Sequence, residues 1–204
     1  MQGSLHLNRM RTQHAAHLCR LFELSAAAQK LLETIPATTP FLYALIAQRQ
    51  WLDAVKLLAY GLRKRRAIWW ACLICRDYIK TIIKSDPEKC RRELAVVLLA
   101  EIWVRDPQQQ NRTNAYNAGL GVDTSSPVHW LASAVCCSAA NLPRNPAEPV
   151  LSSHYIYARA ICMVLECAAA HSEHGEDIYR QALRQGVCLA ARNNDQRMRG
   201  RFCS

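Results

Sequence analysis

The chain is organised around one stretch, Gly61-Leu-Arg-Lys-Arg-Arg-Ala-Ile-Trp-Trp-Ala-Cys-Leu-Ile-Cys-Arg76. It holds two of the five tryptophans, a run of four basic residues and a Cys-x-x-Cys pair. Large aromatic side chains need packing partners on several sides to be buried. We therefore expect the neighbouring segments to pack around this stretch. The tryptophans expected to organise the core are Trp69, Trp70, Trp103 and Trp130.

The composition predicts an all-α protein. Half of the 204 residues are hydrophobic and only seven are glycine, so the chain can bury a sizeable core. No sustained alternation of apolar and polar residues indicates a strand. We expect a single-domain bundle of seven to eight helices over residues 12–192, with neighbouring helices paired antiparallel. Residues 1–11 and 193–204 are expected to be flexible, the latter as a basic tail.

Four helix starts are marked by a capping side chain directly before a proline, which suits the first helical position. These pairs are Thr39-Pro40, Asp86-Pro87, Asp106-Pro107 and Ser126-Pro127. From these helix-start signals we expect one helix over 41–60, which ends at Gly61 in the left-handed conformation. An N-terminal helix is expected over 12–33. The proline-rich segment 141–153 is the best candidate for a functional loop.

The formal net charge of +10 favours an anionic partner, such as an acidic protein, nucleic acid or a phospholipid surface. No apolar run approaches the roughly 18–20 residues that span a bilayer. The first 20 residues lack the apolar region of a secretory signal. We therefore expect a cytoplasmic protein whose cysteines are reduced thiols.

The four-residue basic run is expected to form a tight reversal between two helices. There its charges suit the C-terminus of the first helix and disfavour the N-terminus of the second. Three interpretations stay open: a solvated turn, a contact for an acidic protein, and phosphate contacts beside stacking tryptophans. The residues expected to bind a partner are Arg63, Lys64, Arg65, Arg66, Arg76 and Lys80.

Two cysteine patterns have the spacing of possible sites. Cys72 and Cys75 lie in an apolar helical surround without a second pair, which favours inert core thiols over a zinc or redox site. Cys167, His171 and His174 would share one helix face if the helix continued past residue 170, and could then hold a transition metal. The His-Ser-Glu-His-Gly sequence favours a helix end and a turn instead.

Catalytic signatures are lacking: the sequence has no nucleophile elbow, Walker loop, Rossmann fingerprint or His-Glu-x-x-His motif. Glu101 and Glu166 could form a carboxylate pair, but each is expected to pair with an arginine, namely Arg105 and Arg159. We expect a protein that is not an enzyme and needs no cofactor.

The stretch resembles an uncharacterised bacterial all-helical family with a Leu-Pro-x-Arg-x-Ala-x-Trp-Trp-Ala core and a later Trp-Val-x-x-Pro element. The second element corresponds to Trp103-Val-Arg-Asp-Pro107. The resemblance covers roughly residues 45–140, and this chain departs from it in having Arg63 at the position of the proline. It implies a small accessory protein of bacterial secretion systems and supplies no catalytic residues.

Together these observations predict a non-catalytic helical adaptor or chaperone-like protein that binds a protein partner, an acidic one for preference. A nucleic-acid-binding regulator that uses the basic run is the alternative. The sequence does not distinguish oligomeric states.

Overall fold

The computed structural model describes residues 6–139 and 155–191, and every regular element within them is an α-helix. Two isolated β-bridges, Met10–Leu62 and His14–Ala37, add no strand. The helices are α1 (Ala15–Cys19), α2 (Ala26–Thr34), α3 (Thr38–Ala47), α4 (Trp51–Gly61), α5 (Lys64–Ile82), α6 (Pro87–Arg105), α7 (Gln109–Gly119), α8 (Pro127–Cys136), α10 (Ile156–Ala170) and α11 (Gly175–Ala191). The all-α prediction is confirmed.

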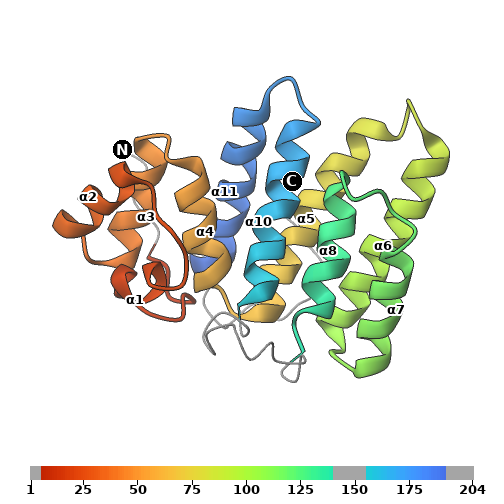
Figure 1. The fold of residues 1–204 in the computed structure, drawn as a ribbon, viewed down its shortest axis with the longest axis horizontal. Coiled ribbons are helices and arrows are strands. Elements are labelled where there is room, and N and C mark those ends of the chain that lie inside the picture. The colour runs from red at the N-terminus through yellow and green to blue at the C-terminus, as the bar shows by residue number, and fades with distance from the viewer. Residues whose placement is uncertain (1–5, 140–154, 192–204) are drawn as a thin grey trace.

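The helices form a compact bundle that runs from α1–α3 at one end to α6 and α7 at the other (Figure 1). Helices α5 and α10 lie in the middle, where α10 contacts α4, α5, α8 and α11. None of the described helices is long and apolar enough to cross a membrane.

Two of the proline-marked starts are confirmed at atomic detail. The Asp86 side chain accepts a hydrogen bond from the backbone N–H of Lys89 at 2.9 Å and so caps α6. The Ser126 hydroxyl accepts one from the backbone N–H of Val128 at 3.2 Å and caps α8. Each side chain satisfies one of the unpaired donors that every helix N-terminus leaves.

Two expected helices are each divided, which raises their number within the described residues to ten. The helix expected over 41–60 ends at Ala47 and resumes at Trp51. Between them Arg49 adopts a left-handed conformation with φ 57°, the only positive φ among the described non-glycine residues. Neither glycine nor proline marks this reversal, so the residue pattern over 41–60 did not predict it.

The N-terminal region also differs from expectation. The helix expected over 12–33 is divided into α1 and α2, and the Ser25 hydroxyl caps α2 by accepting from the backbone N–H of Ala28. Residues 6–11, expected to be flexible, pack on the bundle, where Leu7 is fully buried. The expected loop 141–153, the tail 193–204 and residues 1–5 lie outside the described residues.

Gly61 ends α4 as expected, but the predicted left-handed conformation is wrong, because no described glycine has a positive φ. Its role is close packing. A Cβ at this position would lie 2.2 Å from the Cε of Met10, well inside contact distance. The missing side chain therefore lets the N-terminal segment lie against the end of α4.

The expected core is formed around Trp70 and Trp103, which are 0% and 3% exposed. Trp69 and Trp130 are partly buried and pack against the same core. All nine cysteines within the described ranges are unpaired. Burial raises the pKa of the thiols of Cys72 and Cys75, as expected of inert core residues.

Candidate functional site

The basic run begins α5. Arg63 is the N-cap residue, and Lys64, Arg65 and Arg66 form the first turn. A helix N-terminus carries a partial positive charge, so four cations at this point repel the helix dipole as well as one another. Only residues 62 and 63 separate α4 from α5, which fits the predicted short reversal.

The N-terminal segment brings further cations to the same place. The backbone N–H of Arg11 donates to the carbonyl of Gly61 at 2.8 Å, and its guanidinium Nε donates to the carbonyl of Leu62 at 3.2 Å. The backbone N–H of Arg9 donates to the carbonyl of Ala190 in α11. These bonds fix two arginines beside the start of α5.

The pKa values of Lys64 and Arg66 are both affected by neighbouring cations. Burial lowers the pKa of Lys64, and the charges of Arg11 and of Arg112 in α7 lower it further. Burial likewise lowers the pKa of Arg66, with Arg9 and Arg63 adding to the effect. Every charged group that shifts these two values is a cation. We name this cluster the basic face; its residues are Arg9, Arg11, Arg63, Lys64, Arg65, Arg66 and Arg112.

Two residues of the run also hold neighbouring helices together. The Lys64 ammonium donates to the carbonyl of Ser138 at 3.3 Å. The Arg65 guanidinium donates from Nε to the carbonyl of Val104 at 2.8 Å and from Nη2 to that of Arg105 at 3.2 Å. Arg65 thereby satisfies carbonyls at the C-terminus of α6, which have no partner within their own helix.

Replacing Arg65 by alanine is therefore expected to lower the free energy of unfolding by about 1–2 kcal/mol, because two charge-assisted hydrogen bonds are lost at a partly exposed helix end. The matched control is Arg63→Ala, an exposed neighbour expected to change stability by less than about 0.5 kcal/mol. Urea unfolding followed by circular dichroism measures both. Equal losses for the two variants would contradict the capping role.

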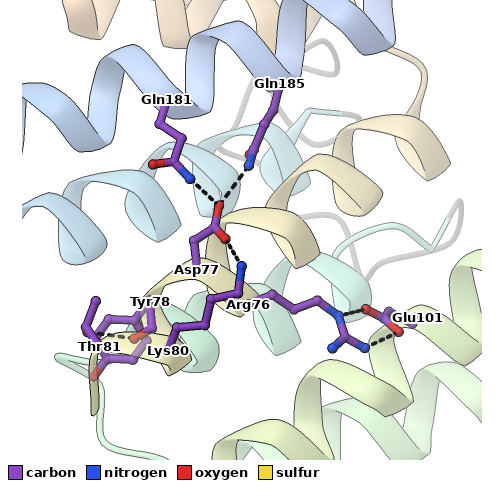
Figure 2. Close-up of polar contacts among 8 residues, drawn as sticks. All are labelled: Arg76, Asp77, Tyr78, Lys80, Thr81, Glu101, Gln181 and Gln185. Carbon is purple, nitrogen blue, oxygen red and sulfur yellow. Dashed lines mark hydrogen bonds and ion pairs between the residues drawn. The ribbon is translucent and has the colours of Figure 1, made fainter. Parts of the chain in front are cut away.

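The structure does not bring Arg76 and Lys80 to the basic face. Arg76 lies ten residues beyond Arg66 on the same helix, which places it about 15 Å further along the axis. It is bound to Glu101 of α6, and Lys80 is bound to Asp77 (Figure 2). Arg76 and Lys80, expected to bind a partner together with the basic run, are thus each engaged in an ion pair within the chain.

The tryptophans do not form a stacking platform beside the run. Trp70 is fully buried, and its indole N–H donates to the carbonyl of Ala182 at 2.8 Å. Trp69 packs partly against the core. Base stacking needs an accessible aromatic face, so the arrangement removes the main support for nucleic-acid binding at this place.

The candidate metal site is not assembled. Helix α10 ends at Ala170, so the helix face that Cys167, His171 and His174 would share is broken. The Nδ1 of His171 donates to the carbonyl of Cys167 at 2.9 Å. Within the described residues, no three His, Cys, Asp or Glu side chains lie together as metal ligands would. Gly175, expected to stop this helix, instead begins α11.

Sequence reasoning missed Arg9, Arg11 and Arg112 as members of the basic face. All three come from segments distant in sequence from residue 63, and none carries a local motif. Their approach depends on tertiary bonds such as those of Arg11 to the end of α4. An alternating Arg-x-Arg spacing over 9–11 is the one signal in the sequence, and it is weak.

These features define the chain as an all-helical bundle with a basic face at the start of its central helix. The chain belongs to the family of unknown function DUF6931, whose model matches residues 41–190. No curated protein and no solved structure matches it. The family's function is unknown, so the link to secretion systems stays a prediction.

Proposed function

We propose that the protein is a non-catalytic helical binding module that docks an acidic segment of another protein on the basic face. The observation that carries this proposal is the gathering of seven cations from three parts of the chain around one helix N-terminus. Such a concentration of like charge costs stability in the free protein: burial lowers the pKa of Lys64 and Arg66, and the neighbouring cations lower both pKa values further. Binding of carboxylates would relieve that cost.

An acidic protein is favoured over nucleic acid for two reasons. Trp70 is buried, so the run lacks the accessible aromatic pair that would stack on bases. The cations of the basic face also come from several elements of the chain. DNA-binding proteins that read a groove present their basic residues along one recognition helix. Components of bacterial secretion systems or their effectors are the partners that the sequence resemblance suggests.

Partner capture tests the proposal with two charge-reversal variants. The first changes Arg63, which is exposed, and Arg66, which is half-buried, to glutamate. The control changes Lys30 and Lys84, exposed cations on α2 and beyond the end of α5, in the same way. Each variant lowers the formal net charge from +10 to +6. Lys64 and Arg65 are left intact because they also hold the bundle together.

Tagged protein is used to capture partners from bacterial lysate with and without nuclease, followed by mass spectrometry. We expect a discrete protein that survives nuclease, is retained by the control variant and is lost from the Arg63/Arg66 variant. Loss of all captured material after nuclease treatment would favour the nucleic-acid alternative. Equal loss of capture by both variants would show that total charge, rather than the basic face, is responsible, and full capture by both would contradict the proposal.

A further inference from the structure

A cavity of about 290 Å³ lies on the half of α5 remote from the basic face. Its walls are the second half of α5, the end of α10, the turn between α10 and α11, and α11 as far as Gln185. The volume is at the lower end of the range for small-molecule pockets, about 300–1,000 Å³. Figure 2 shows part of the wall, where Asp77 of α5 faces Gln181 and Gln185 of α11.

The charge of the cavity is opposite to that of the protein. Asp77 and Glu173 are its charged lining residues apart from histidine, and neither lysine nor arginine lines it. The chain as a whole carries a formal charge of +10. From outside the lining, the Lys80 ammonium forms an ion pair with Oδ1 of Asp77 at 2.6 Å, and its side chain is 75% exposed, so a cation in the cavity would share Asp77 with Lys80 or displace it. A cation entering the cavity would therefore meet carboxylates at its wall.

Hydrogen bonds from two glutamines hold the Asp77 carboxylate in place. They also leave the amide oxygens of these glutamines free of Asp77. Oδ2 of Asp77 accepts from the side-chain amides of Gln181 at 2.7 Å and Gln185 at 2.8 Å. A carboxylate only accepts, so both amides present their nitrogen to Asp77 and keep their oxygen for another donor. Oε1 of Gln185 has no partner within the described residues. The hydroxyl of the lining residue Tyr78 is also without a partner there and can donate or accept, so the wall keeps one unpaired acceptor beside one group of either kind.

His171, one of the two histidines that line the cavity, can add a further acceptor. His171 donates from Nδ1 to the carbonyl of Cys167, and in the tautomer with its one proton on Nδ1 the other ring nitrogen, Nε2, is an acceptor. The remaining wall is apolar and includes Ile74, Ala168 and Ile178. A matching ligand has a cationic, donor-rich head and a short aliphatic body.

We propose that this cavity binds an alkylguanidinium or alkylammonium group. The group is either a free small molecule or the end of an arginine or lysine side chain, since both sources present the same chemistry. The head would lie against Asp77 and Glu173, and the aliphatic part against the apolar wall. A guanidinium is the better fit because its planar set of N–H donors matches carboxylates and amide oxygens.

The test uses butylguanidinium and its uncharged isostere butylurea as probes, with isothermal titration calorimetry on the full chain. We expect butylguanidinium to bind saturably with one molecule per chain, and butylurea to bind about tenfold more weakly or not at all. Asp77→Asn is expected to weaken butylguanidinium binding about tenfold, since it removes the oriented charge and leaves an acceptor oxygen. Circular dichroism establishes that this variant is folded.

Glu173→Gln provides a second variant at an exposed position whose change does not endanger the fold. Glu33→Gln, an exposed carboxylate on α2, is the matched control and is expected to bind as the wild type does. Equal binding of both probes, or full binding by Asp77→Asn and Glu173→Gln together, would overturn the proposal. Binding of the peptide acetyl-Gly-Arg-Gly-amide at the strength of butylguanidinium would identify a side chain as the source, and its exclusion a free small molecule.

Discussion

Replacing Trp70 by alanine is expected to lower the free energy of unfolding by about 3–5 kcal/mol. The side chain is fully buried between α5 and its neighbours. Its indole N–H donates to the carbonyl of Ala182 in α11, so the change removes a hydrogen bond as well as packing. Urea unfolding followed by far-ultraviolet circular dichroism measures the loss.

The packing around Trp70 explains the size of this effect. Gly186 of α11 lies so close that a Cβ there would be 2.8 Å from Leu58 and 3.1 Å from the Trp70 ring. A side chain fitted this tightly leaves a cavity that its surroundings fill only partly. Trp69→Ala is the control, and its loss should be clearly smaller because Trp69 is only partly buried. Equal losses at the two positions would contradict Trp70 as the centre of the core.

Replacing Arg76 by alanine is expected to cost about 3 kcal/mol, because it leaves the charge of Glu101 buried without its main partner. The Glu101 side chain is 3% exposed. It accepts from Nε and Nη2 of Arg76 at 2.5 and 2.8 Å, while Arg105 lies 3.7 Å away. Hydrogen bonding to Glu101 is the main cause that raises the pKa of Arg76. Thermal and urea unfolding measure the change.

The double variant Arg76→Met/Glu101→Met tests whether the unpaired charge of Glu101, rather than lost packing, causes the loss of stability in Arg76→Ala. Replacing both charges by apolar groups of similar size is expected to recover most of the stability lost in Arg76→Ala. If the double variant were as unstable as the single one, packing rather than the unpaired carboxylate would be the cause.

Two of the four helix starts that carry a local signal were predicted well from the sequence. Thr39 and Asp106 do not cap α3 and α7, whose N-cap residues are Ala37 and Gln108. Asp86-Pro87 and Ser126-Pro127 begin α6 and α8 where expected, because capping and the fixed φ of proline act within a few residues. The reversal at Arg49 could not be predicted in this way, since an arginine in the left-handed conformation is held there by its surroundings.

The contacts around the basic face and the cavity also go beyond what local sequence patterns predict. Arg63–Arg66 were predicted as binding residues from their run of charge, and the sequence also suggested that Glu101 meets Arg105. The principal partner of Glu101 is Arg76, from another helix. Asp77 is held by Gln181 and Gln185, more than 100 residues away in the chain. Contacts of this kind depend on helix packing, which no local pattern encodes.

Binding of an acidic peptide tests the central claim most directly. A labelled polyglutamate peptide and a single-stranded oligonucleotide of equal length are titrated at matched ionic strength, with fluorescence anisotropy as the readout. The wild type is compared with the Arg63/Arg66 and Lys30/Lys84 glutamate variants. We predict that the peptide binds the wild type and the Lys30/Lys84 variant alike, and the Arg63/Arg66 variant about tenfold or more weakly. Equal peptide binding by all three proteins would contradict the assignment of the basic face as the docking site.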